Sequence, residues 1–149
     1  MSISYDVFTE AFLWKVTEYN FLRCDQDDRV RLIDGYLKKS VAEFKKICKY
    51  DLSSTADDEA REFAVNIPDE DLDEIVDIIS EGMLVQWMKP YFYKQENLQN
   101  TLNTRDFTTY SPAELLHRIQ DAYNTAKRDF VNMMREYSYN HADLTELHL

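Results

Sequence analysis

Glycine and proline are scarce in this chain, with two glycines and three prolines among 149 residues. Their usual shares are about 7% and 5% of residues. Tight β-turns depend on both residue types, so the composition disfavours many short strands and favours long helices. The chain also lacks a recognisable secretory signal and any apolar run long enough to span a bilayer. We therefore expect a soluble, intracellular protein without membrane contact.

Cysteine and histidine are scarce as well, with two and three copies. Cys24 and Cys48 are too few and too far apart for a metal-clip motif, and we expect ordinary reduced, buried or half-buried thiols. All three histidines lie in the last third of the chain, so neither cysteine has a local motif for nucleophilic catalysis. The two glycines, Gly35 and Gly82, stand alone, which excludes a glycine-rich phosphate loop.

The chain has no basic surplus, since 17 lysines and arginines face 28 acids for a net charge of −11. Residues 51–81 contain twelve of the acids and a single base, Arg61, and thus carry −11 themselves. The other 118 residues hold 16 acids and 16 bases and are neutral overall. Because no basic region of comparable density exists to displace counterions, we do not expect specific binding to nucleic-acid phosphates.

The most informative stretch is residues 68–92, which is acidic at its start and apolar at its end. Its apolar residues recur at three-and-four spacing, which predicts a central helix that supplies the middle of the core. That stripe is Leu72, Ile75, Val76, Ile79, Met83 and Trp87. We expect Pro90 to end or kink this helix. Its acids Asp73, Asp77 and Glu81 repel one another at four-residue spacing, so helix stability alone does not explain them.

Three further helices have readable signals. Ser4 can cap a helix reaching about residue 22, and a second helix should span about 27–50. The motif Ser111-Pro112-Ala113-Glu114 is a capping box that opens a helix to about residue 137. A short helix over 91–102 is also expected.

The second helix has two unusual features. Gly35 lies in its middle, where glycine costs about 1 kcal/mol relative to alanine, so we expect a close backbone contact there. Lysines crowd its C-terminal half, the end of a helix that favours cations. They are Lys38, Lys39, Lys45, Lys46 and Lys49. We interpret this cluster as a solvated face, with an anion site as the alternative.

These elements predict an all-α fold with about four to five helices in a bundle-like arrangement. We expect a single helical domain over residues 1–137 with an irregular acidic loop at 51–67, where a partner contact is plausible. Residues 138–149 are too short to fold alone, yet several of them are apolar. We interpret this segment as a C-terminal docking tail.

Two patterns match part of a metal-binding motif but lack the remaining ligands. Glu114 and His117 have the Glu-x-x-His spacing of carboxylate-bridged bundles, which need two such units and two further glutamates. Residues 69–74 are rich in carboxylates, but they lack the glycine that an EF-hand loop requires. We therefore predict no metal, no cofactor and no enzymatic activity.

At the level of whole segments the chain resembles a known family. The acidic helix closes on Met-Leu-Val-Gln-Trp-Met-Lys-Pro (83–90), and Phe-Thr-Thr-Tyr-Ser-Pro (107–112) opens a long helix. This order resembles the head–tail adaptor (head completion, neck) proteins of tailed bacteriophages. The resemblance implies a structural virion protein, a subunit of a dodecameric ring that binds beneath the portal protein. Such a ring extends the DNA channel without specific DNA binding and receives the tail or a stopper protein.

Two groups of residues are candidates for such contacts. We expect an acidic surface, facing the DNA channel or a ring surface exposed to DNA, formed by Asp57, Asp58, Glu59, Asp69, Glu70, Asp71, Asp73, Glu74 and Asp77. We expect subunit or portal interfaces at Trp87, Tyr91, Phe92, Tyr139, Leu144, Leu147 and Leu149.

A second reading of the same charge is a small acidic binding module, such as a DNA-mimic inhibitor of a host protein. That protein would be a monomer or dimer and would compete with DNA for a basic partner, whereas an adaptor would form rings. An enzyme is the third and weakest reading, because convergent titratable groups of different types are lacking.

Overall fold

The structure, a computed structural model, describes residues 2–16, 29–93 and 112–141. This part of the chain is mostly helical, which confirms the expected all-α class. Its helices are α1 (Tyr5–Val16), α2 (Arg29–Phe44), α3 (Asp69–Tyr93) and α5 (Pro112–His141). Several predictions lie outside the described residues: the end of the first helix, Cys24, most of the 91–102 helix, and the tail residues Leu144, Leu147 and Leu149.

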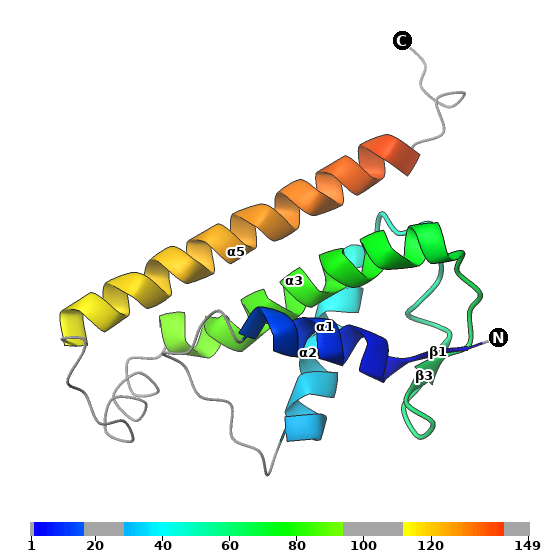
Figure 1. Cartoon of the computed structure of the whole chain (residues 1–149), viewed down its shortest axis with the longest axis horizontal. Coiled ribbons are helices and arrows are strands. Elements are labelled where there is room, and N and C mark those ends of the chain that lie inside the picture. The colour runs from blue at the N-terminus through cyan, green and yellow to red at the C-terminus, as the bar shows by residue number, and fades with distance from the viewer. Residues whose placement is uncertain (1, 17–28, 94–111, 142–149) are drawn as a thin grey trace.

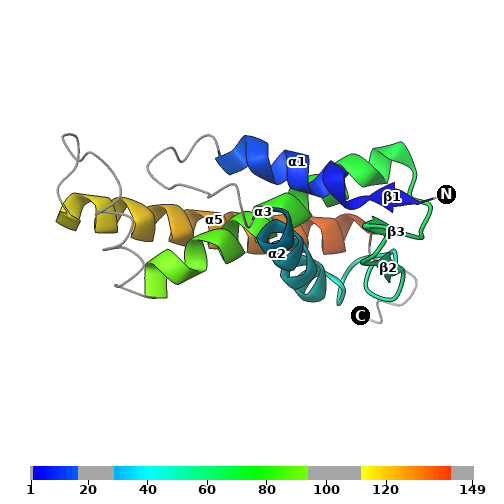
Figure 2. The same cartoon turned by 90° about the horizontal axis from the view of Figure 1, so that it is seen from below.

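Helix α3 is the centre of the molecule. It contacts α1, α2 and α5, and these are the main contacts between elements of the described part. Figure 1 shows α5 running antiparallel along α3 on one side, while α1 lies on another side of α3. Figure 2, turned by 90°, shows α2 crossing the other helices steeply in the foreground. Three helices therefore pack around one.

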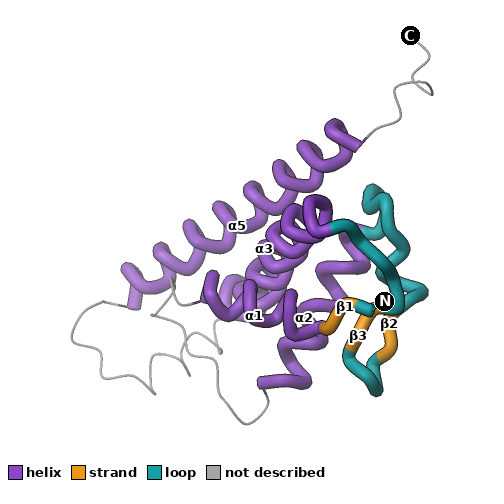
Figure 3. Tube along the Cα trace, turned by 45° about the vertical axis from the view of Figure 1, so that its right-hand side comes forward, coloured by secondary structure: helices purple, strands orange, loops and turns teal. Residues whose placement is uncertain are grey.

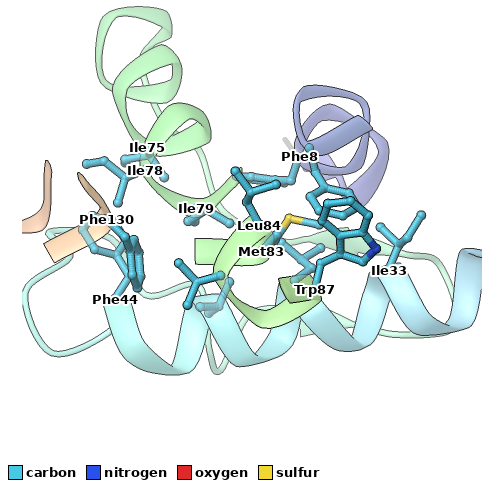
Figure 4. Close-up of a cluster of buried hydrophobic side chains, with 14 of the residues drawn as sticks. Phe8, Ile33, Phe44, Ile75, Ile78, Ile79, Met83, Leu84, Trp87 and Phe130 are labelled. Carbon is cyan, nitrogen blue, oxygen red and sulfur yellow. The ribbon is translucent and has the colours of Figure 1, made fainter. Parts of the chain in front are cut away.

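The predicted apolar stripe of α3 forms the middle of the core (Figure 4). Ile75, Ile79 and Met83 are fully buried, and Leu72 and Val76 pack against them partly buried. In its second half most of the circumference of the helix is buried, through Leu84, Val85, Trp87 and Met88, while Gln86 is partly buried and Lys89 is exposed. A helix with apolar residues on more than one face packs on more than one side, and each fully buried side chain of this kind contributes about 1.5–3 kcal/mol.

Two prolines lie near the two ends of α3, and they affect the helix differently. The carbonyl of Pro68 accepts the first helical hydrogen bond, from the amide of Leu72 at 2.9 Å. Pro90 does not end the helix, because α3 continues to Tyr93. In the last turn a proline removes one helical hydrogen bond, which the buried second half of α3 can offset.

The close backbone approach lies at Gly82 and not at Gly35. A Cβ atom added to Gly82 of α3 would lie 2.2 Å from Oγ of Ser40 in α2 and 2.8 Å from the ring of Phe130 in α5. A Cβ added to Gly35 meets no described heavy atom within 4 Å. The expected contact at Gly35 was therefore wrong, and it is at Gly82 that side chains of α2 and α5 approach the backbone of α3 closely.

Residues 51–67, which were expected to be irregular, supply two strands of a small sheet whose third strand lies at the start of the described chain. Its two-residue strands are β1 (Ile3–Ser4), β2 (Ala56–Asp57) and β3 (Glu62–Phe63). They pair antiparallel in the order β1-β3-β2 (Figure 3), with Ile3 opposite Phe63 and Ala56 also opposite Phe63. Strands of two residues are too short to show alternation, which is why the stretch read as irregular.

The helix boundaries differ from the expected ones by a few residues. The Ser4 cap is confirmed, since Oγ of Ser4 accepts a hydrogen bond from the amide of Asp6 at 3.2 Å. Helix α2 ends at Phe44, earlier than expected, and a turn follows in which the Phe44 carbonyl accepts hydrogen bonds from the amides of Ile47 and Cys48, both at 3.1 Å.

Helix α5 begins at Pro112, as its motif predicts, although the capping Ser111 lies outside the described residues. It continues to His141, so residues 138–141 belong to α5 and not to a separate tail. The extension is anchored by Tyr137, which is fully buried with its ring edge against Phe44 at 4.9 Å.

Candidate functional site

The nine carboxylates of the predicted acidic surface lie on two adjacent structures. Asp57, Asp58 and Glu59 belong to the hairpin that joins β2 to β3, and the other six occupy the first turns of α3. Figures 1 and 2 both show the hairpin and the start of α3 at the right-hand end of the molecule. Their partners divide them into two groups.

On the hairpin, two of the three acids are engaged within the molecule. Oδ1 of Asp57 accepts hydrogen bonds from the amides of Glu59 and Ala60, both at 3.1 Å. Asp58 forms an ion pair with Lys38 of α2 and accepts a hydrogen bond from the Tyr5 hydroxyl at 2.9 Å. These bonds from Lys38 and Tyr5 hold the pKa of Asp58 below its usual value. The acids thus fix the turn and tie it to α1 and α2.

Arg61, the one base between residues 51 and 81, is also engaged inside the molecule. Its guanidinium contacts Asp34 of α2 through two hydrogen bonds and Asp6 of α1 at 3.0 Å. The hydrogen bonds with Asp34 are the main cause of a raised Arg61 pKa. Its backbone has φ of 53°, the left-handed region that glycine usually occupies, and its carbonyl accepts the amide hydrogen of Tyr5 at 2.9 Å.

Two acids on α3 contact residues far away in sequence. Asp71 accepts a hydrogen bond from the Tyr50 hydroxyl at 2.5 Å, which raises the Tyr50 pKa to about 12. Glu74 lies 3.2 Å from Nε2 of His141 at the end of α5. The His141 ring stacks on Tyr137 with centroids 4.2 Å apart. These contacts join the start of α3 to α5 and to the segment after α2.

Asp77 and Glu81 share one cation. Nζ of Lys15 lies 2.8 Å from a carboxylate oxygen of each, and 3.0 Å from the Asp77 carbonyl. The like-charge repulsion expected at this four-residue spacing is therefore offset by a lysine of α1. The sequence pattern of α3 could not show this, because Lys15 is more than sixty residues away along the chain.

Four acids of the predicted surface remain available to the outside: Glu59, Asp69, Glu70 and Asp73. All are exposed, and within residues 2–16, 29–93 and 112–141 no ion pair or side-chain hydrogen bond engages their carboxylates. We call these four the acidic end. They lie at the hairpin tip and in the first turn or so of α3, at the same end of the molecule.

The predicted interface residues lie in different environments. Trp87 is only 2% exposed and packs edge-on against Phe12 with centroids 6.1 Å apart, so its assignment to a surface contact is corrected. It is buried because α1 covers that side of α3. Tyr139 of α5 is 82% exposed and available for contact. The side chains of Tyr91 and Phe92 lie outside the described part.

The candidate metal and thiol groups are placed as follows. Among the described residues, no group of three or more His, Cys, Asp or Glu side chains is arranged to hold a metal ion. His117 faces Asp121 one turn further along α5 at 3.3 Å. Cys48 is a half-buried free thiol whose pKa is raised mainly by burial.

A shallow groove separates α2 from the hairpin. Val41, Leu52 and Phe63 form its buried floor, and Lys38 and Asp58 stand at its rim. Its volume is about 300 Å³, at the lower end of the range for ligand sites.

The main chemical feature of this site is its negative charge, from one available carboxylate on the hairpin and three on the first turns of α3. In the described part, no helix combines the length and apolarity needed to cross a membrane. Comparison of the chain with protein-family models, curated proteins and solved structures finds no match.

Proposed function

We propose that this chain is a structural subunit of a head–tail adaptor ring in the neck of a tailed-phage virion. In this role it binds beneath the portal protein, extends the DNA channel and receives the tail or a stopper protein. The proposal rests on the segment order that resembles this family and on a helical fold of suitable size. One observation of the structure carries its functional part.

That observation is the acidic end. Most acids of the predicted surface are satisfied by partners inside the molecule, but Glu59, Asp69, Glu70 and Asp73 are exposed and have no described partner. Their field reaches about one Debye length, roughly 8–10 Å at physiological salt. A ring multiplies this charge, and a channel lined by carboxylates repels phosphates and limits sticking of the passing DNA.

The portal-facing side is assigned to the end of α5. Tyr139 is exposed on its last turn, and aromatic residues are enriched at protein interfaces. The apolar residues Leu144, Leu147 and Leu149, which follow in sequence and lie outside the described residues, are further candidates for this contact.

Mixing the purified chain with the portal protein encoded in the same genome tests the role. We expect negative-stain images to show a second ring attached coaxially to the portal, and mass photometry to show a matching mass increase. A chain that stays monomeric and leaves the portal mass unchanged would contradict the proposal.

Charge reversal tests the channel function. We expect rings carrying Glu59→Lys and Glu70→Lys to retain linear DNA at low salt, because the added cations attract phosphate, whereas unaltered rings release it. The matched control is Glu10→Lys with Glu136→Lys, which makes the same change in net charge at exposed positions on α1 and α5. Equal DNA retention by both variants would exclude a channel role for Glu59 and Glu70.

The acidic end also supports the second candidate, an acidic binding module or DNA-mimic inhibitor. Exposed carboxylates on a single subunit can occupy a phosphate-binding site of a basic protein. This candidate requires a monomer or dimer by sedimentation velocity, together with competition against DNA for a basic host protein. Ring formation with the portal is the outcome that separates the adaptor from it.

A further inference from the structure

The segment that precedes the acidic residues 51–81 has a net positive charge. Residues 29–50 contain seven lysines and arginines and only two acids. Of its lysines, Lys38 pairs with Asp58, and Nζ of Lys49 lies 5.7 Å from the centre of the Tyr50 ring. Lys39, Lys45 and Lys46 are exposed, and no ion pair within the described ranges engages them. We call these three residues the lysine ridge.

The lysine ridge and the acidic end do not neutralise each other within one molecule, since the described ion pairs join neither to the other. The lysine ridge lies on α2 and just beyond its C-terminal end, whereas Asp69 and Asp73 lie on α3, and the side chains of both patches are exposed.

The two patches differ in their support. Asp69 and Asp73 are four residues apart and share one stripe of α3, whereas Glu70 lies about 100° further round the helix. Lys39 lies on α2, which ends at Phe44, and Lys45 and Lys46 lie in the turn that follows. Glu43, the one exposed acid between them, leaves the ridge with a net positive charge.

We infer that the lysine ridge of one copy docks against Asp69 and Asp73 of a second copy of this chain. The inference rests on the proposed ring-forming function and names the contact between its subunits. Glu59 and Glu70 lie off this contact and stay available to the channel.

Charge complementarity selects a second copy as the occupant. One chain supplies both partners of the contact in equal number, and two different patches meeting make a heterologous contact, the kind that closes into a ring. A nucleic acid is the less suitable occupant, because the net charge of −11 opposes its approach at long range. Charged contacts of this kind fix register and association rate and weaken with salt.

Complementary charge reversal tests the contact by sedimentation velocity at about 50 mM and about 500 mM salt. We expect Lys39→Glu with Lys46→Glu, and separately Asp69→Lys with Asp73→Lys, each to weaken self-association about tenfold or more. An equimolar mixture of the two variants should restore association, because each supplies the charge that the other has lost. All four positions are exposed, and circular dichroism checks that both variants keep the fold.

The matched control for the lysine-ridge variant is Lys127→Glu with Arg135→Glu, which lowers the net charge by the same amount at exposed positions of α5. Association lost equally in the control, or a mixture no better than its components, overturns the contact. Rings that persist on the portal in both reversed variants overturn it while leaving the adaptor role intact. A wild-type chain that neither self-associates nor binds the portal overturns both.

Discussion

Arg61 donates two hydrogen bonds to the carboxylate of Asp34, from Nε to Oδ2 at 2.8 Å and from Nη2 to Oδ1 at 2.9 Å. This fork joins the hairpin to α2, and a third bond to Asp6 joins it to α1. An arginine fork matches carboxylate geometry in a way that a lysine cannot. The contact holds the tip that carries Glu59 in one place relative to the helices.

Two substitutions of Arg61 distinguish the effect of losing its side chain from the effect of its left-handed backbone. We expect Arg61→Ala to destabilise the fold by about 2–3 kcal/mol, because it loses the partly buried ion pairs and keeps a left-handed backbone. Arg61→Gly loses the same pairs but tolerates φ of 53°, so it should cost about 1 kcal/mol less. Urea unfolding of both variants measures the difference. Identical midpoints would show that the left-handed backbone stores no strain.

The two glycines should respond oppositely to alanine. We expect Gly82→Ala to destabilise by about 1–3 kcal/mol, because its methyl group collides with Ser40, whose hydroxyl is buried and bonded to the Ile79 carbonyl at 2.8 Å. Gly35→Ala meets no described atom and should stabilise by about 0.5–1 kcal/mol through helix propensity. Thermal unfolding of the two variants checks both signs. A destabilised Gly35→Ala would reveal a contact that the described residues do not make.

Lys15 should stabilise the fold by compensating the negative charges of Asp77 and Glu81. We expect Lys15→Met to destabilise by about 1–3 kcal/mol, because Glu81 is only 14% exposed and would lose its partner. Adding Glu81→Gln should recover much of the loss by removing the repulsion with Asp77. A double-mutant cycle measured by urea unfolding gives the coupling. Strict additivity of the two changes would mean that the ion pair contributes no net stability.

Alkaline pH should weaken the fold through its engaged tyrosines. Burial raises the pKa of Tyr137 to about 12, and the hydrogen bond to Asp71 raises that of Tyr50 to about 12, from about 10 in an unfolded chain. The folded state thus favours the neutral phenols. Their contribution is fully present below pH 10 and is lost as pH rises from 10 through 12.

Unfolding midpoints measured between about pH 8 and pH 11 check this dependence. Tyr137→Phe should flatten the alkaline decline, at the expense of some stability at neutral pH, because the amide of Lys49 donates to the Tyr137 hydroxyl at 3.1 Å. An unchanged decline would assign the alkaline sensitivity to other groups.

Local sequence patterns predicted the helices well where one helix face is apolar. They predicted the environment of a side chain less well where a partner distant in sequence determines it. The three-and-four spacing from Ile75 to Trp87 placed α3 and its core residues. It could not distinguish a buried Trp87 from one at an interface, because α1 covers that side only in three dimensions. For the same reason the acids of α3 read as one surface, although Lys15, Tyr50 and His141 engage four of them.

The glycines and the hairpin also show features that a local sequence pattern could not predict. A lone glycine within a helix signals a close contact only if something approaches it, and that depends on helix crossings, as at Gly82. The hairpin turns through Arg61 in a conformation for which glycine is the usual signal. Its stabilisation comes from Asp34 and Asp6, which no local motif connects to it.

Because Trp87 is buried in the core, intrinsic tryptophan fluorescence can report on the state of the fold. The chain has two tryptophans, and one is 2% exposed in the core while Trp14 on α1 is 77% exposed. Their emission should therefore separate, with a blue-shifted component that iodide cannot quench and a red-shifted component that it can. A loss of the first reports the opening of the bundle around α3, and a change confined to the second reports an event at the surface of α1. Fluorescence alone can thus tell an opening of the core from a change at the surface of α1, without an attached dye.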